Sequence, residues 1–419
     1  MKKVAPSWRM EQELKQSVFC SADPVGEAAR RGAQLVLQKA IEVEIDEFLG
    51  RGRYERKADS TPGLRNGYEP MKVHTAEGTI ELQVPQLRGT VEPFESAWLN
   101  AIGKRSGRLM DLIPMLYVKG MSQRDIEDAL TTALGVERTG RNVVSEVCRS
   151  LRGSFEAWQD RDLAGEGVVY LFLDGIYLNL RPDDKGKIAV LCAYGLRWDG
   201  KKVLLHLAVG DKESKECWES FIEDMKRRGL KDPLLAVIDG AAGLRKAVGR
   251  KLPNTLVQRC QVHKMRNIIN KLPQSARNAI KKRLQAAFTE KTYEDGLAKA
   301  RAIMAEFQDA FPEAMRCLER DLEECLTALK FPYVHRKFIR TTNLLERLFG
   351  EGKRRTKVIP RFTSEQSGLS LVYAVLVDAS EGWHGLRMRE DVVARLKQML
   401  VDPNSQWNDP EVAKIKAAA

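Results

Sequence analysis

The sequence predicts a mixed α/β domain preceded by a mainly helical region that contains a small β-hairpin. Three observations support this. Short apolar strands and amphipathic helices follow one another after residue 167 in the order βββαβαβ, which predicts a mixed five-stranded sheet. About seventy residues after His263 are almost purely helical in pattern, which predicts a helical insertion. Alternating apolar and polar residues between 66 and 88 predict a hairpin.

The N-terminal region begins with one long predicted helix. Residues Gly26–Gly50 place apolar side chains at helical spacing and end on a glycine. The hairpin follows at Asn66–Arg88, with Glu77-Gly78 as its turn. Two strands alone are too few for a stable sheet, so we expect helices to pack on them.

Three short helices are predicted between Asp111 and Leu151. The first ends at Gly120, Ser122 caps the second, Gly135 ends it, and the third starts near Arg141. This arrangement resembles a helix-turn-helix DNA-binding unit. A plain three-helix packing unit has the same pattern and remains open.

The α/β part starts with three strands joined by short turns, which is typical of an antiparallel meander. The fourth strand is apolar throughout and is therefore expected at the centre, paired in parallel. The predicted strands are Val168–Leu180, Lys187–Leu196, Val203–Gly210, Leu234–Gly240 and Thr255–Cys260, with helices Ser214–Arg228 and Leu244–Val248 between the last three. The helical insertion is broken at Pro273, at residues 289–293 and at Pro312, and a polar tail with one helix follows Arg387.

These patterns predict seven regions along the chain. They are an N-terminal helical DNA-binding or dimerisation region (1–60), the hairpin module (61–100), the three-helix region (101–160), the first part of the core (161–270), the helical insertion (271–332), the last part of the core (333–386) and the tail (387–419).

The charge of the chain favours a polyanionic partner. The 419 residues are 43% apolar and 30% charged, and the net charge is +12 with a pI near 9.3. Solubility alone can account for some of this excess, but the basic residues cluster, which favours a nucleic-acid-binding surface. The clusters are Arg51–Lys57, Lys281–Leu284, His335–Arg340 and Gly352–Lys357.

The cysteines and the apolar runs place the protein inside the cell. The seven cysteines are unpatterned and contain no CxxC pair, which is typical of reduced thiols. The N-terminus lacks the apolar segment of a secretory signal. No apolar run is long enough to span a membrane.

Two aspartates interrupt or end predicted buried strands. Asp174 lies in the first strand and Asp239 at the tip of the fourth. Each is followed by glycine, so each can simply cap a turn. If the fourth strand pairs beside the first, however, the two carboxylates become neighbours, and neighbouring carboxylates repel unless a proton or a cation lies between them. Such a pair suits Mg²⁺.

Glu346 is the best candidate for a third acid. Asn343 and Glu346 have the spacing of a capping box, which is the structural alternative. Glu346 also shares a helix face with Gly350, which leaves space for a metal or phosphate. Arg347 and the basic run Lys353, Arg354 and Arg355 on the same helix are predicted DNA contacts.

At this point the sequence resembles the Mutator-type DDE transposases of bacterial insertion sequences. The motifs that carry the resemblance are LFLDG, AVIDG, NLLERLFGEGKRR, the hairpin segment and RCQVHKMRN. The resemblance implies an RNase H-like core in which Asp174, Asp239 and Glu346 are catalytic and bind two Mg²⁺ (or Mn²⁺) ions. It also implies binding to double-stranded DNA at terminal inverted repeats and at target sites, a homodimer, no membrane, and a bacterial cytoplasmic, nucleoid-associated location.

The motif Cys260-x-x-His263 is a possible half of a zinc site, but no second pair stands at suitable spacing. The family resemblance implies a role for His263 near DNA or metal, and a packed, hydrogen-bonded histidine is the alternative. Lys264 and Arg266 are predicted to contact phosphate.

Two other functions remain to be compared with transposition. An RNase H-like nuclease or resolvase would hydrolyse DNA without strand transfer, but it would not need the long region before Gly167. A non-catalytic DNA-binding regulator would leave the acids in the strands unexplained.

Overall fold

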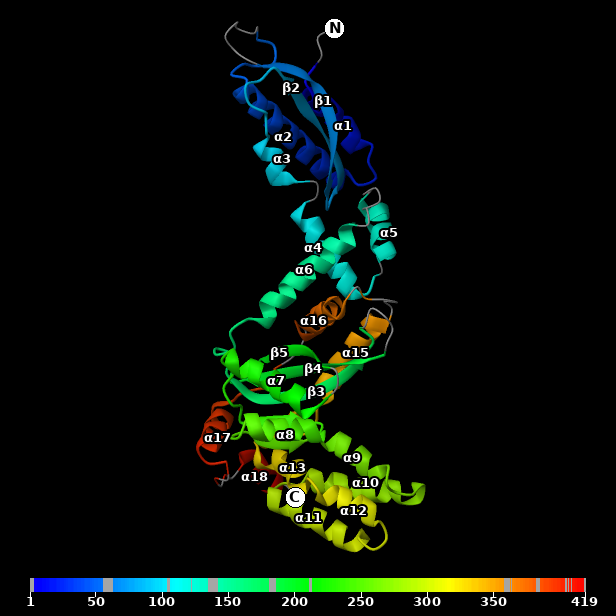
Figure 1. The fold of residues 1–419 in the computed structure, drawn as a ribbon, viewed down its shortest axis with the longest axis vertical. Coiled ribbons are helices and arrows are strands. Elements are labelled where there is room, and N and C mark those ends of the chain that lie inside the picture. Colours follow the sequence, from blue (N-terminus) through cyan, green and yellow to red (C-terminus); the bar gives the residue numbers. More distant parts are fainter. Residues whose placement is uncertain are drawn as a thin grey trace. The chain divides into compact units, whose positions relative to one another are not determined.

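A computed structural model describes residues 4–55, 63–103, 106–121, 123–134, 142–180, 186–210, 213–357, 362, 364–381, 385–403, 405, 407 and 409–417. Contacts divide the chain into two compact units, residues 1–147 and 148–419 (Figure 1). Within the described ranges, no helix is long and apolar enough to cross a membrane. The structure confirms the predicted class, a five-stranded mixed sheet with helices in one unit and helices with a hairpin in the other.

The first unit is built on a long helix packed against the hairpin. The long helix is α2 (Pro24–Phe48), and the antiparallel strands are β1 (Leu64–Thr75) and β2 (Gly78–Arg88). The turn residues are Ala76 and Glu77, one position earlier than predicted, because Thr75 pairs with Gly78. The small core between helix and hairpin consists of Ile41, Val73, Ile80 and Leu82.

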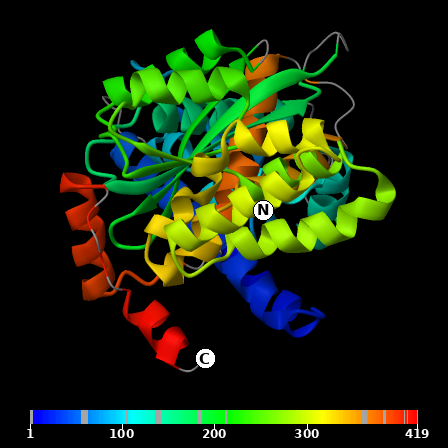
Figure 2. The same cartoon turned by 90° about the horizontal axis from the view of Figure 1, so that it is seen from below.

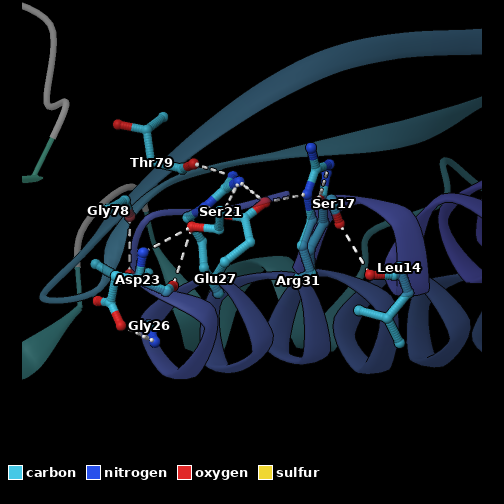
Figure 3. A network of polar contacts seen from close by, with 12 residues as sticks. Leu14, Ser17, Ser21, Asp23, Gly26, Glu27, Arg31, Gly78 and Thr79 are labelled. Atoms are coloured by element: carbon cyan, nitrogen blue, oxygen red, sulfur yellow. Dashed lines mark hydrogen bonds and ion pairs between the residues drawn. The ribbon is translucent and has the colours of Figure 1, made fainter. Parts of the chain in front are cut away.

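Polar contacts also fix α2 along the hairpin. Gln38 donates from Nε2 to the Gln83 carbonyl at 3.0 Å and accepts from the Gln83 N–H at 2.8 Å. At the start of α2, Asp23 caps the helix by accepting from the Gly26 N–H, as Figure 3 shows. Glu27 there pairs with Arg30 and Arg31, and Arg30 reaches the Thr79 carbonyl at 3.3 Å.

The remaining helices of this unit are α1 (Pro6–Phe19), α3 (Ala97–Ile102), α4 (Gly107–Lys119) and α5 (Gln123–Leu134), followed by α6 (Asn142–Gln159), which continues into the second unit. Helix α4 ends as predicted at Gly120, which is left-handed. The predicted cap Ser122, the end at Gly135 and the start at Arg141 lie outside the described residues, so the helix-turn-helix interpretation stays a prediction.

The second unit is organised around a sheet with the strand order β5-β4-β3-β6-β7. The strands are β3 (Val168–Leu178), β4 (Ile188–Arg197), β5 (Lys202–Gly210), β6 (Leu235–Ile238) and β7 (Leu256–Arg259). The first three form the predicted antiparallel meander, and β6 pairs in parallel with both β3 and β7. The fourth strand is therefore central and paired in parallel, as its apolar sequence predicted, and it lies beside the first strand.

Alternate residues of β3 face different layers, because strand side chains alternate. Leu171 and Leu173 join the core under α7 (Lys215–Arg227) and α8 (Ala242–Lys251), whose green ribbons lie on one side of the sheet in Figure 2. Tyr170 points the other way, where its hydroxyl contacts His335 Nδ1 at 2.8 Å.

The helical insertion has its own apolar core and is joined to the sheet by a buried ion cluster. Its helices are α9 (Gln261–Ile269), α10 (Gln274–Phe288), α11 (Tyr293–Phe307), α12 (Pro312–Glu319), α13 (Leu322–Leu326) and the short 3-10 turn η1 (Thr327–Lys330). The cluster consists of Asp321 with Arg259 at the end of β7 and Lys264 in α9.

The helices after the insertion are α14 (Tyr333–Ile339), α15 (Asn343–Lys357), α16 (Glu365–Glu381), α17 (Glu390–Val401) and α18 (Pro410–Ala417). Two helices therefore follow Arg387, where one was predicted. They are packed rather than being a polar tail, because Leu396 and Met399 are fully buried and the Asp409 carboxylate accepts from the Tyr333 N–H at 2.7 Å.

We predict that Asp321→Asn lowers the free energy of unfolding by about 3–5 kcal/mol, because it leaves the buried cations of Arg259 and Lys264 without a counter-charge. Urea denaturation measures the change. Glu306→Gln, which breaks the exposed pair with Arg283, is the matched control and should leave stability nearly unchanged. Equal effects of the two substitutions would contradict a structural role for the buried cluster.

Candidate active site

Two strand ends bring the candidate aspartates together. Leu173 in β3 pairs with Ile238 in the parallel strand β6. Asp174 is the next residue of β3, which continues to Leu178, and Asp239 directly follows the end of β6. The two carboxylates are therefore neighbours at the point where the parallel pairing of β3 and β6 ends. Ligand sites of open α/β sheets lie at the carboxyl ends of parallel strands, where this pair stands.

It is electrostatically unfavourable for Asp174 and Asp239 to be charged at the same time. Asp174 is only 6% exposed. Burial, followed by the charge of Asp239, raises the pKa of Asp174 to about 7, against the opposing effect of His263 and of the Gly175 N–H. Near neutral pH, this buried carboxyl is therefore poised to exchange its proton for a cation.

A glycine follows each aspartate for a steric reason. Gly240 has a φ of +81°, and a Cβ built there would lie 1.9 Å from Arg259 Nε. A Cβ on Gly175 would lie 2.6 Å from a carboxylate oxygen of Glu213. Asp239 also accepts from the Ala241 N–H at 2.9 Å, so the turn-capping role expected of an Asp-Gly pair is present as well.

Glu213 is a fourth carboxylate that the sequence analysis did not identify. It lies just before α7, over Gly175, and is half-buried. Burial and the charge of Asp239 raise the pKa of Glu213. No strand or spacing pattern marks this residue in the sequence, because it follows β5 in a connecting segment; only the folded chain brings it to the aspartates.

Glu346 reaches the site from α15 and is held by His263. The first helical residue is Asn343, and the Glu346 N–H donates to the Thr342 carbonyl, so Thr342 occupies the cap position. The capping box considered for Asn343 and Glu346 is therefore displaced by one residue.

His263 Nε2 lies 3.3 Å from Glu346 Oε1. Added Cβ atoms at Gly350 would meet nothing within 4 Å, which agrees with the open space expected there.

Cys260 is a close neighbour of His263 and contacts Thr342. The thiol sulfur accepts from Thr342 N–H at 3.4 Å and from its hydroxyl at 3.5 Å. Burial would raise the pKa of the Cys260 thiol, but its hydrogen bonds with His263 and Thr342 bring it down to about 7. The interaction with Cys260 is also the main cause that raises the pKa of His263, and the charges of Asp174 and Glu346 add to it. The CxxH pair thus links β7, α9 and α15 at the site.

The predicted DNA-contacting residues separate into exposed and buried groups. Arg266, Arg347, Lys353 and Arg354 are exposed. Lys264 and Arg355 are only 2% and 5% exposed. Contrary to the sequence prediction, Lys264 is therefore a partner of Asp321 in the interior, and Arg355 is enclosed by its neighbours, because both lie on the apolar faces of their helices.

The donor set fits a hard divalent cation in part. Asp174 and Asp239 offer carboxylate oxygens, and a cation between them would relieve the repulsion that raises the Asp174 pKa. Among the described residues, no three His, Cys, Asp or Glu side chains are close enough to hold a metal ion by themselves. Mg²⁺ is commonly held by one or two carboxylates together with water and substrate phosphate.

Comparisons with known proteins assign a family to this chain. A family model described as "Transposase, Mutator family" matches residues 7–385. The transposase for insertion sequence element ISRM5 of Rhizobium meliloti is 32% identical over 88% of this chain and 91% of its own length. The transposase for element IS406 of Burkholderia multivorans is 34% identical over 86% and 92%, respectively. The transposase for element IS256 in transposon Tn4001 of Staphylococcus aureus is 27% identical over 83% and 89%.

We predict that Asp174 makes the chelator-treated protein less stable as the pH rises. Its carboxyl binds a proton more tightly in the folded state, where its pKa is about 7, than in the unfolded chain, where it is 3.8. Its contribution is therefore complete below pH 3.8 and is lost as the pH rises through 7, by up to about 4 kcal/mol in total. Urea denaturation at pH 5.5 and pH 8 measures the loss.

The comparison that tests this prediction is Asp174→Asn, which should be more stable than wild type at pH 8 and should show less pH dependence. Asp160→Asn removes an exposed aspartate from the same unit and should keep the wild-type dependence. Mg²⁺ added at pH 8 should stabilise wild type but not Asp174→Asn. Identical pH dependence of wild type and Asp174→Asn would contradict the prediction.

Proposed function

We propose, from the premise that the chain belongs to the Mutator family of transposases, that it mobilises an insertion sequence by metal-dependent cleavage and joining of DNA strands. The observation that supports this proposal is that Asp174 and Asp239 are neighbours where the parallel pairing of β3 and β6 ends. Glu346 contacts His263, which in turn lies near Asp174. An acidic cluster at a strand edge beside exposed basic helices suits the hydrolysis and transfer of phosphodiesters.

In this proposal Asp174, Asp239 and Glu346 hold the divalent ions, Mg²⁺ or Mn²⁺, of which two are expected. When bound, the ions activate the attacking hydroxyl and stabilise the leaving oxygen. The protein itself orients the ligands: β3 and β6 fix the two aspartates, and His263 holds the Glu346 carboxylate through Nε2. Ligands fixed in this way do not have to be reordered in each reaction cycle.

The chemistry needs two exchanges of phosphodiester bonds. In the first, water attacks the phosphorus at the element end, one P–O bond forms, the bond to the 3′ oxygen breaks, and a free 3′-hydroxyl results. In the second, that hydroxyl attacks a target phosphodiester and displaces its 3′ oxygen, so the number of P–O bonds is unchanged and no external energy source is required. No covalent bond between protein and DNA is involved.

Recognition of the terminal inverted repeats is assigned in this proposal to the first unit, with α4, α5 and the hairpin as its reading elements and its Arg and Lys side chains as phosphate contacts. In the second unit, exposed Arg347, Lys353 and Arg354 on α15 extend from Glu346 and suit the DNA backbone beside the reacting bond.

Two element ends have to be held together, and a homodimer supplies one site for each. Val36 and Val43 support a protein contact on α2. They are 65% and 56% exposed and lie two helical turns apart on one face.

The deciding experiment incubates the purified protein and Mg²⁺ or Mn²⁺ with labelled DNA that carries an element end and with target DNA. We expect wild type to nick at the 3′ end and to join strands. Asp174→Asn, Asp239→Asn and Glu346→Gln should bind the DNA but lose at least about a hundredfold in both steps, because each removes a charge that holds the ions. Gel electrophoresis resolves the nicked and joined products.

Glu351→Gln is the matched control, because Glu351 lies on the same helix as Glu346 but pairs with Arg354. It should keep near wild-type activity. Full activity of Glu346→Gln would remove that residue from the site. A wild-type protein that cuts but never joins would replace transposition by the nuclease function.

A further inference from the structure

A cleft of about 800 Å³ lies behind the candidate active site, between α9, α10, α14 and the first residues of α15. Its volume is in the range of sites that enclose a ligand. The cleft and the active site share two elements: α9 carries Val262 in the cleft wall and His263 at the site, and α15 carries Asn343 in the cleft wall and Glu346 at the site.

The cleft is positively charged. Its lining includes Arg266, Lys281, Lys337 and Arg340, and none of the residues that line it is acidic. Lys281 and the stretch from His335 to Arg340 belong to two of the basic clusters in the sequence that the proposed reaction does not use. The concentration of cations without counter-charges in the lining favours a polyanion.

The cleft also offers apolar and aromatic surface. Val262, Met265, Ile269 and Phe288 contribute to its lining. A second hollow of about 470 Å³ shares Lys337 and Arg340 with it. There α14 presents Tyr333 and Phe338, each 40% exposed. Basic side chains that alternate with exposed aromatic rings are typical of sites for unpaired nucleic-acid strands, because only unpaired bases expose their faces for stacking.

Hydrogen bonds hold the walls of the cleft in place. The Gln261 N–H at the start of α9 donates to the Arg340 carbonyl at 3.0 Å. The Gln261 side chain donates to the Phe288 carbonyl of α10 at 3.4 Å. Arg336 in α14 donates to the Lys291 carbonyl at 2.8 Å, beyond the end of α10. The three helices therefore form a preformed wall, and little ordering is required on binding.

We propose that this cleft binds an unpaired DNA strand next to the bond that the active site cuts. In the cleft, Arg266, Lys281, Lys337 and Arg340 contact the phosphates. Tyr333 and Phe338 stack on bases in the adjoining second hollow, whose lining also contains Glu290 and Glu411. A duplex would satisfy the cations but would offer the rings only base edges. The inference rests on the proposed function, which identifies DNA as the substrate. It adds that the helical insertion recognises this DNA as an unpaired strand.

The test measures binding of the full-length protein to a fluorescein-labelled 12-nucleotide oligo(dT) and to a duplex of the same length, by anisotropy in EDTA. Lys281→Glu should weaken binding of the single strand about tenfold. It should also lower the salt slope of that binding by about 0.7 for one lost phosphate contact. Lys282→Glu makes the same charge change on the next residue of α10, which does not line the cleft, and should change binding by less than about twofold.

Stacking has its own variant pair. Phe338→Ala should weaken binding of the single strand at least about fivefold and leave duplex binding unchanged. Leu400→Ala, which removes an exposed apolar side chain from α17, should change neither. Equal effects of Lys281→Glu and Lys282→Glu, or equal losses on single strand and duplex, would overturn the proposal. So would unchanged single-strand binding by Phe338→Ala.

These measurements need no cleavage, so they separate the two proposals. If Asp174→Asn cuts DNA as well as wild type while Lys281→Glu and Phe338→Ala lose the single strand, the proposed catalytic site fails and the cleft is confirmed. If the Asp174 variant is inactive but the cleft variants bind like wild type, the inference fails and the proposed function stands.

Discussion

The repulsion between Asp174 and Asp239 is the constraint on which the rest of the second unit depends. Two carboxylates side by side in neighbouring buried segments raise the free energy of the folded chain unless a proton or a cation compensates them. Burial, followed by the charge of Asp239, raises the pKa of Asp174 accordingly. The apolar packing of β3 and β6 under α7 and α8 keeps the pair together despite this cost.

The helical insertion has a structural part in the same site. Its buried Asp321 binds Arg259 from the end of β7 and Lys264 from α9. Arg259 in turn lies over Gly240, directly after Asp239. The strand end and the helix that carries His263 are thereby tied to one point of the insertion. A change in the insertion is therefore expected to alter the position of His263 in the candidate site through α9, without any contact to the acids themselves.

The positive charge of the chain serves two purposes that composition alone cannot separate. Lys264 and Arg355 are buried and stabilise the fold, whereas Arg266 and Lys281 face an open cleft. A buried cation needs a partner such as Asp321, and an exposed one does not. Whether a cation is buried or exposed depends on its position on the helix. A cation on the apolar face is buried together with that face.

The sequence by itself determined the elements and most of their pairing. The apolar run of residues 234–240 indicated a central parallel strand, and Asp174 and Asp239 were recognisable because a carboxylate in a buried strand is costly. Both predictions come from short stretches of sequence, because the spacing of apolar residues within a strand is a local property.

Only the tertiary structure decided which residues meet across the fold. The contact of His263 with Glu346, the position of Glu213 over Gly175, the burial of Lys264 and the packing of the two C-terminal helices all join distant segments. These contacts join side chains from elements that are far apart in the sequence. Local sequence periodicity therefore gives no sign of them. The proximity of Asp174 to Asp239 was therefore predictable, whereas the contact partners of His263 and the position of Glu213 were not.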